Sequence, residues 1–491
     1  MRLSSGILSQ LTVPTPTYDR SQLQTGIVHF GVGNFHRSHQ AMYLDRSMNA
    51  GQDLEWGICG VGVRPADAAL REALLGQDML YTLMIKHADG AIEPRVIGSL
   101  IDFLYAPDDP DQVIERMARP TTRIVSLTIT EGGYNIDPYS GQFILDHPDV
   151  QHDLEHLDQS RTVFGLVVAA LKRRRAADIG PFTVMSCDNI EANGAVARQC
   201  FGSFAQLVEP DLGEWVLHEV MFPNSMVDRI TPIASDADRA TLQSTFGYTD
   251  DCVVVSEAYE QWVLEDAFSA GRPDLSSVGV QTVADVEPYE LMKLRLLNAG
   301  HQAMAYFGAL AGYQFAHEAA GDPLIRQLLD RYMAQEATPT LRPVPGIDLA
   351  QYRATLIQRF ANPQVADTLA RLCTDTSDRI PKFLLPVVRE NLAAGRATPM
   401  AAAVVASWAR YLRGVDDNGQ AIRVVDQRAE PLIELANHPD DPIAFLRFRP
   451  VFGDLASEKA FTDSYLTTLQ DLRTSGVRDT LQKVLSSAEM R

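Results

Sequence analysis

Cysteine is scarce in this sequence and never occurs in a CxxC spacing. The 491-residue chain has five, namely Cys59, Cys187, Cys200, Cys252 and Cys373. Their odd number and wide separation argue against a disulfide framework and against a zinc cluster. Long apolar runs are also missing, since no stretch approaches the roughly 18 residues of a membrane span, and the first residues lack a signal-peptide pattern. We expect a protein of the reducing cytoplasm, with no metal site and no membrane partner.

Basic residues are outnumbered as well. The 43 Lys and Arg residues against 63 Asp and Glu give a formal net charge of −20, so there is no global positive field to hold a nucleic acid or an anionic membrane surface. Hydrophobic residues make up 46% and charged residues 22%, which is ordinary globular composition, and the length predicts two or three domains. Composition does not determine the oligomeric state.

Short apolar runs separated by helical patterns characterise the first half of the chain. We expect strands over residues 26–33, 56–63, 123–129, 182–187 and 252–256, and helices over residues 35–49 and 162–175. Near-continuous apolar strands are typical of parallel sheets that are buried on both faces. The alternation predicts a doubly wound α/β domain.

From about Pro288 onward, the pattern changes to long segments rich in Ala, Leu, Arg and Glu. Few β-branched runs remain, so this part is predicted to be mostly α-helical. We place the boundary near residue 285, which gives domains over residues 1–285 and 286–491.

A glycine-containing turn follows the first predicted strand. Gly31 and Gly33 match the first two glycines of a dinucleotide fingerprint, with His36 at the third position. Such glycines permit a tight turn and let a pyrophosphate approach the backbone N–H groups. A purely structural turn would also use glycine. The predicted cofactor loop consists of Gly31, Val32, Gly33, Asn34 and Phe35.

The loop after the second predicted strand contains the residues expected to contact the adenosine ribose. Asp67 is the acid that would bind a ribose hydroxyl. Arg64 in the same loop is suited to a 2′-phosphate, so the sequence leaves the choice between NAD and NADP open.

Two further predicted strands end in polar residues. Glu131 lies in the run TITEGGY, and Asn189 lies in SCDN. Ligands collect at the carboxyl ends of parallel strands. The alternatives are a turn with a solvated glutamate, and a helix N-cap in the second run.

The segment of residues 290–301 (ELMKLRLLNAGH) carries the strongest local signal. At about 100° per residue, Lys293, His301 and Asn298 project at about 0°, 80° and 140° around a helix. A desolvated lysine can act as a general base, and an asparagine amide can donate to a developing alkoxide. The alternative is an amphipathic helix with a surface lysine, whose ion-pair partner would be Glu290.

Together these segments resemble the polyol-specific long-chain dehydrogenases, the mannitol dehydrogenase family. The matching runs cover almost the whole chain: IVHFGVGNFHRSHQAMYLD (27–45), SLTITEGGY (126–134), FTVMSCDN (182–189), MVDRITP (226–232), QWVLEDAF (261–268), KLRLLNAGH (293–301) and PVPGIDL (343–349). The resemblance implies a Rossmann-type first domain, a helical second domain, and a zinc-independent catalytic cleft between them.

The resemblance also implies a role for each candidate residue. Lys293 would be the general base, with Asn189 and Asn298 around the reacting oxygen. Three residues would bind further substrate hydroxyls, namely Asp228, His301 and Arg371. Glu131 and Glu290 would serve proton movement to and from the lysine. The implied reaction is the reversible NAD-dependent oxidation of a polyol to a ketose, D-mannitol to D-fructose, by a monomer.

Other substrates and other classes remain as alternatives. D-arabinitol differs by one carbinol unit, which a pocket discriminates only modestly. Fructuronate and tagaturonate reductases act on substrates that carry a carboxylate. Fructuronate reductases resemble the chain elsewhere, but tend to have a lysine in place of Gly132. Ala66 stands where close relatives tend to carry a second acid, which weakens discrimination against NADP. A nucleotide-binding sensor would not need the Lys293 set, and a decarboxylating hydroxy-acid dehydrogenase would release CO₂.

Overall fold

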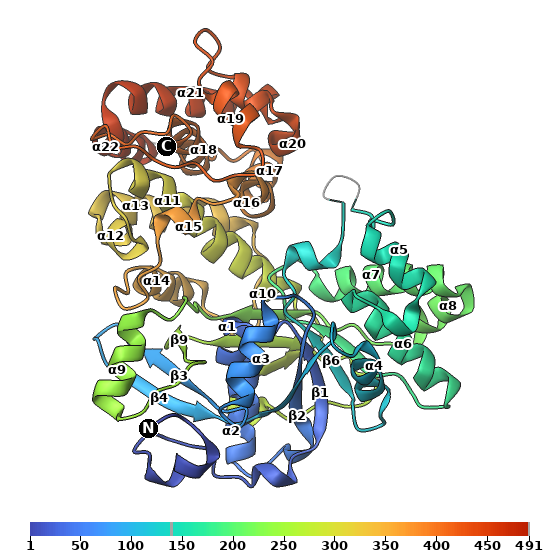
Figure 1. Ribbon diagram of the computed structural model, residues 1–491. Coiled ribbons are helices and arrows are strands. Elements are labelled where there is room, and N and C mark those ends of the chain that lie inside the picture. Colours follow the sequence, from blue (N-terminus) through green and yellow to red (C-terminus); the bar gives the residue numbers. More distant parts are fainter. Residues whose placement is uncertain (138–140, 490–491) are drawn as a thin grey trace. The chain divides into compact units, whose positions relative to one another are not determined.

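The computed structural model describes residues 1–137 and 141–489 (Figure 1). Contacts between Cα atoms divide the chain into two compact units, Met1–Glu287 and Pro288–Arg491. All strands that the structure describes lie in the first unit, and the second is built from helices. Among the described residues, no helix is long and apolar enough to cross a membrane.

The first unit is organised around a five-stranded sheet in which all paired strands are parallel. The strand order is β5-β2-β1-β6-β7. Its strands are β1 (Thr25–Phe30), β2 (Gly57–Gly62), β5 (Leu100–Tyr105), β6 (Ile124–Leu127) and β7 (Thr183–Ser186). The chain winds outward from β1 through β2 to β5 and then crosses to β6 and β7, so β1 and β6 flank the topological switch point. The prediction of a doubly wound sheet is confirmed.

Alternating side chains of the sheet enter two different cores. Val28 and Phe30 of β1 pack with the helices α4 (Pro110–Ala118), α6 (Val163–Ala176) and α7 (Asn193–Val208). Ile27 packs on the opposite face, with α2 (Gln40–Asn49) and β3 (Tyr81–Lys86). Both faces are therefore buried, which explains the near-continuous apolar runs in the sequence.

Two smaller sheets complete this unit. In one, β10 (Gln261–Glu265) pairs antiparallel with β8 (Ser225–Asp228) and parallel with β11 (Gln281–Val283). In the other, β3 lies between β4 (Ile92–Ile97) and β9 (Val254–Glu257). The predicted strand at 252–256 is thus real as β9, but its expected place in the main sheet is wrong. An apolar run indicates burial and does not specify which sheet a strand joins.

The single helix expected over residues 35–49 is also wrong in detail. It is interrupted at His39 (φ −120°, ψ −89°) between α1 (Asn34–Ser38) and α2. The carbonyl of Arg37 accepts a hydrogen bond from the Tyr81 hydroxyl at 2.7 Å, and that of Ser38 accepts one from Arg229 at 2.7 Å. In a continuous helix these two carbonyls would accept from backbone amides, but here they accept from side chains that are distant in the sequence. The local sequence does not reveal such partners.

The second unit is a helical assembly whose most buried members are α11 (Ala299–Leu310) and α18 (Pro399–Tyr411). Its other α-helices are α10 (Glu287–Met292), α12 (Ala316–Gly321), α13 (Pro323–Arg331), α14 (Leu349–Phe360), α15 (Leu369–Leu372), α16 (Thr376–Phe383), α17 (Leu385–Ala393), α19 (Ala429–Ala436), α20 (Arg449–Phe452), α21 (Lys459–Thr474) and α22 (Gly476–Glu489). Two π-helical segments, η7 (Lys293–Asn298) and η8 (Tyr332–Ala337), interrupt this pattern. The prediction of a mostly helical second half is confirmed.

Candidate active site

The predicted cofactor loop leaves the sheet at the switch point between β1 and β6. Gly31 has φ +90°, and a Cβ at this position would lie 2.1 Å from the Thr128 carbonyl oxygen. A side chain is therefore excluded at Gly31 for purely structural reasons. Gly33 differs, because a Cβ there would have no neighbour closer than 3.8 Å. Open space above Gly33 fits the close approach of a pyrophosphate to the backbone.

The position of the third fingerprint glycine is filled by His36, which lies inside the protein. Its ring stacks on that of His29 with 3.4 Å between centroids. Burial lowers the pKa of His29 to about 3 and that of His36 well below its usual value, so both rings are neutral at physiological pH.

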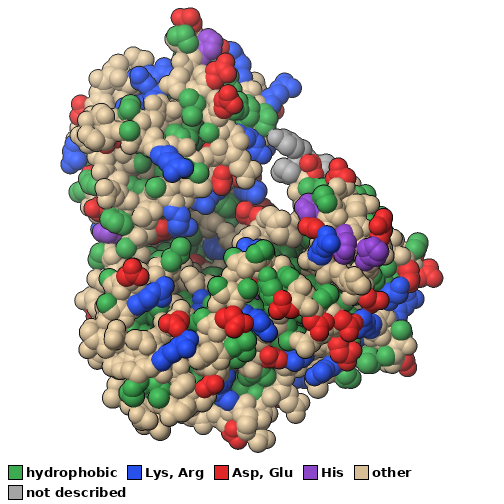
Figure 2. Space-filling model, viewed as in Figure 1, with side chains coloured by type: hydrophobic (Ala, Val, Ile, Leu, Met, Phe, Trp, Pro, Cys, Tyr) green, Lys and Arg blue, Asp and Glu red, His purple; other side chains and the backbone are tan. Residues whose placement is uncertain are grey.

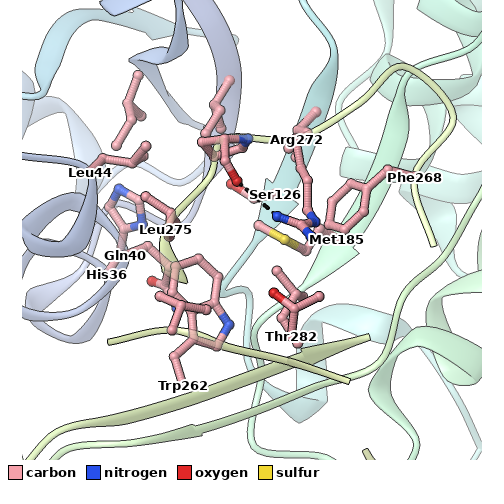
Figure 3. A pocket seen from close by; sticks show the side chains of 16 residues that line it. His36, Gln40, Leu44, Ser126, Met185, Trp262, Phe268, Arg272, Leu275 and Thr282 are labelled. Carbon is pink, nitrogen blue, oxygen red and sulfur yellow. Dashed lines mark hydrogen bonds between the residues drawn. The ribbon is translucent and has the colours of Figure 1, made fainter. Parts of the chain in front are cut away.

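A small cavity adjoins His36 (Figure 3). Its volume is about 20 Å³, and His36, Gln40 and Trp262 contribute buried nitrogen or oxygen atoms that make no hydrogen bond. This space suits about one water molecule and is far too small for a sugar or a nucleotide.

Arg37 holds the cofactor loop in place through hydrogen bonds. Its guanidinium donates to the Gly33 carbonyl at 3.3 Å, to the Asn34 side chain at 2.8 Å and to the Cys252 carbonyl. Arg37 is 4% exposed. A buried arginine thus connects the loop to the segment that leads into β9.

Asp67 and Arg64 lie together in the turn after β2. One oxygen of Asp67 accepts hydrogen bonds from the backbone of Val63 at 3.0 Å and of Arg64 at 2.9 Å, and the other lies 3.3 Å from the Arg64 guanidinium. The arginine side chain is 73% exposed. Asp67 therefore shapes the turn, and its side chain is only 18% exposed.

The loop after β6 carries Glu131 on a strained backbone. Thr130, the residue before it, has φ +65° and ψ +169°, a region that is essentially limited to glycine and costs on the order of 1–3 kcal/mol. Glu131 is exposed and begins a short 3₁₀ turn, Glu131–Tyr134. Such strain concentrates at functional sites, which favours a ligand-binding role over a solvated turn.

Asn189 and Asp228 occupy the ends of two strands in the same unit. Asn189 is exposed and follows β7, whereas α7 begins only at Asn193 with Ala192 as its N-cap. The N-cap alternative for this run is therefore wrong. Asp228 is 4% exposed and is the last residue of β8.

Lys293 and Asn298 begin and end the π-helical segment η7. The regular α-helix expected here is wrong, because a π-helix is stabilised by i→i+5 hydrogen bonds. A π-helix has more residues per turn than an α-helix, so five residues make about one turn. The angle between the Lys293 and Asn298 side chains around the helix axis is therefore smaller than the roughly 140° expected for an α-helix. Lys293 and Glu290 are each 8% exposed, which rules out the surface-lysine alternative, and the buried Oδ1 of Asn298 has no hydrogen-bond partner.

His301 and Arg371 lie further along the second unit. The His301 ring is 4.4 Å from that of Phe360. Arg371 is exposed on α15 and forms a two-point ion pair with Asp367. The carbonyl of Leu372, next to Arg371, accepts a hydrogen bond from Gln302 at 3.2 Å, so α15 is tied to the residue beside His301.

Two further observations concern the distribution of surface charge and the grouping of potential metal ligands. On the face shown in Figure 2, basic side chains are scattered among acidic ones. Within residues 1–137 and 141–489, no three His, Cys, Asp or Glu side chains come together as a metal-ligand set, and the five cysteines are buried and free.

Comparisons with known proteins cover both units. Residues 25–277 match the family model described as the mannitol dehydrogenase Rossmann domain, and residues 285–473 match the mannitol dehydrogenase C-terminal domain. Mannitol 2-dehydrogenase from Neosartorya fischeri is 43% identical, with 99% of each chain covered. That from Pyrenophora tritici-repentis is 44% identical, over 98% of this chain and 86% of the relative.

Two solved structures are similar along nearly the whole chain. Pseudomonas fluorescens mannitol 2-dehydrogenase, in a ternary complex with NAD and D-mannitol, is 46% identical with a TM-score of 0.90, and 99% of this chain and 100% of that chain are covered. A substrate-free D-sorbitol dehydrogenase is 36% identical with a TM-score of 0.91, covering 98% and 100%.

Proposed function

The chain belongs to the mannitol dehydrogenase family, and on this premise we propose that it oxidises a polyol to a ketose with NAD as cofactor. D-Mannitol and D-fructose are the proposed pair. The observation that carries the proposal is the likeness, at 46% identity and a TM-score of 0.90, to an enzyme whose complex contains NAD and D-mannitol. We assign the cofactor to residues 1–285 and part of the substrate contacts to residues 286–491, in a monomer of the cytoplasm.

The cofactor loop fits a dinucleotide. The loop formed by Gly31, Val32, Gly33, Asn34 and Phe35 would hold the pyrophosphate, because Gly33 leaves space above the backbone. Asp67 would bind the ribose hydroxyls, and Arg64 leaves NADP as a second cofactor. When bound, NAD supplies the acceptor for the hydride that leaves the substrate carbon.

The protein's own groups move the proton and hold the oxygen. Lys293 accepts the proton of the substrate hydroxyl as general base, while amides of Asn189 and Asn298 donate to the oxygen as charge develops on it. The buried Oδ1 of Asn298 has no hydrogen-bond partner and can accept a hydrogen bond from a substrate hydroxyl, while the Nδ2 of the same amide is the proposed donor. Further substrate hydroxyls are assigned to Asp228, His301 and Arg371. Glu131 and Glu290 are assigned to proton movement to and from the lysine, and no metal takes part.

Initial rates with several polyols test the function directly. We expect NADH formation with D-mannitol that EDTA does not reduce, and slower formation with D-arabinitol and D-sorbitol. D-Arabinitol lacks one carbinol unit. A missing methylene costs roughly 10- to 200-fold, and a hydroxyl-binding residue left without its partner costs more, so D-arabinitol should be clearly slower than D-mannitol. Absence of activity on all three polyols, together with reduction of fructuronate, would instead identify a uronate reductase. Gly132, where fructuronate reductases tend to have lysine, favours the polyol.

Replacing Asp67 should change the cofactor preference. In Asp67→Ala we expect kcat/KM for NAD to fall about tenfold, because a charged hydrogen bond to the ribose is lost, while kcat/KM for NADP rises. The measurement is the ratio of the two values.

Glu318→Ala is the matched control for this test. Its carboxylate also accepts two backbone N–H groups, those of Gln314 and Phe315 at 2.9 Å each. The control should lower stability by about 1 kcal/mol without changing the cofactor ratio. An unchanged ratio in Asp67→Ala would restrict Asp67 to shaping its turn.

A further inference from the structure

Asp188 is a buried carboxylate for which the proposed chemistry has no use. It is 6% exposed and directly precedes Asn189 at the end of β7. Its Oδ1 accepts a hydrogen bond from the Thr130 amide at 2.7 Å. Its Oδ2 accepts one from the Ile129 amide at 3.2 Å and one from the Tyr134 hydroxyl at 2.8 Å. One side chain thereby fastens the loop after β6 to the end of β7.

The fastened loop is the strained one. Thr130 combines a positive φ with an extended ψ, and its amide is the donor in the shortest of the three bonds to Asp188. Strained conformations persist only where the surroundings impose them. Without the carboxylate, we expect the turn to relax and to carry Glu131, the next residue, with it.

The main chain of Asp188 extends the network to a third strand. Asn193 donates to the Asp188 carbonyl at 2.9 Å and to the Ser225 carbonyl at 2.7 Å, and accepts from the Ser225 amide at 3.0 Å. Ser225 begins β8, whose last residue is Asp228. The segments that carry three proposed site residues therefore share one connected set of buried hydrogen bonds.

From this geometry we propose that Asp188 is a positioning residue, which fixes the loop of Glu131 relative to Asn189 in the active site. The proposal rests on the proposed function for the roles of these two residues. Asp188 need not contact the substrate, because its effect passes through the backbone amides that it holds. Displacement of a catalytic group by about 1 Å can cost on the order of 100-fold in rate.

The charge state of Asp188 gives the network a pH dependence. Burial raises the pKa of Asp188 to about 6, and the negative charge of Glu131 acts in the same direction, while the three donors oppose it. The other titratable groups beside it stay neutral, because burial raises the pKa of Tyr134 well above its usual value and that of Cys187 to about 12. Below pH 6, protonation turns an acceptor oxygen into a donor. We therefore expect an inflection in kcat near pH 6, in addition to the fall in acid that protonation of the base Lys293 causes.

The main test is Asp188→Asn, compared with Asp153→Asn. Asp153 is also a fully buried carboxylate, and it accepts the amides of Arg161 and Thr162 at 2.8 Å each. Neither of these partners is a proposed site residue. We expect Asp188→Asn to lower kcat by about 10- to 100-fold, to leave the Kd for NADH unchanged, and to lose the inflection near pH 6 from the acid limb, while the fall caused by protonation of Lys293 remains. Asp153→Asn should lower Tm while kcat and the acid limb stay unchanged.

Tyr134→Phe provides a milder variant should Asp188→Asn not fold. It keeps the ring and removes a donor that favours the charged form of Asp188, so the inflection near pH 6 should move to higher pH and kcat should fall a few-fold. Amide hydrogen exchange at residues 129–131 should be faster in both variants and unchanged in Asp153→Asn.

The outcomes separate this proposal from the proposed function. A folded Asp188→Asn protein with the kcat, acid limb and exchange rates of the wild type would overturn the positioning role. A loss of Tm alone, as in Asp153→Asn, would reduce Asp188 to a structural residue. If the wild type oxidised no polyol, the proposed function would fail, yet the exchange measurement would still decide whether Asp188 holds the loop.

Discussion

Lys293→Met is expected to lose polyol oxidation by about 10² to 10⁴-fold in kcat, the range that one positioned general base contributes. Lys293 is 8% exposed at the start of the π-helical segment η7. Methionine keeps the side-chain length as far as Cε, with sulfur in place of the lysine Cδ, and removes the amine. The Kd for NADH, measured by its fluorescence, should be unchanged because the cofactor loop lies in the other unit.

Lys86→Met is the matched control for this substitution. Lys86 is also largely buried, with a side chain 15% exposed, and its amine lies 2.6 Å from Asp238. Its loss should lower Tm and leave kcat unchanged. Equal kcat in Lys293→Met and the wild type would remove the lysine from its proposed role, and the base would then be sought at Glu131 or Glu290.

The sequence predicts the parallel sheet well because its signal is local. The near-continuous apolar runs at β1, β2, β6 and β7 reflect burial on both faces, and the glycine turn follows from steric limits at Gly31. The sequence does not predict strand β5, and it places β9 in the wrong sheet. The place of each strand depends on its pairing with a segment far away in the sequence, β2 for β5 and β3 for β9. A single sequence does not show such pairings directly.

The side chains that hold the proposed site residues in place are not evident from the sequence. Arg37 and Tyr134 both lie inside runs that suggested function, yet only the structure shows that one braces Gly33 and the other bonds to Asp188. The π-helix was also missed, because a 100° projection assumes a regular α-helix. Within this π-helix, the Arg295 carbonyl accepts a hydrogen bond from the Tyr332 hydroxyl at 3.1 Å.

Gly31→Ala is expected to have the second large effect, through the fold and not through the chemistry. A Cβ would lie 2.1 Å from the Thr128 carbonyl oxygen, and φ is +90°. Relief requires the ends of β1 and β6 to separate. The unfavourable φ and the backbone clash together should lower the free energy of unfolding by about 3 kcal/mol or more. Urea denaturation measures this change, and the Kd for NADH should rise by at least tenfold.

Gly33→Ala, in the same loop, separates folding from cofactor binding. At Gly33 a Cβ would be no closer than 3.8 Å to any protein atom, so stability should stay within about 0.5 kcal/mol of the wild type. The added methyl group would nevertheless occupy space assigned to the pyrophosphate, and the Kd for NADH should rise about tenfold. If Gly33→Ala bound NADH as tightly as the wild type, the pyrophosphate would have to lie elsewhere, and the glycine turn would be explained by the needs of Gly31 alone.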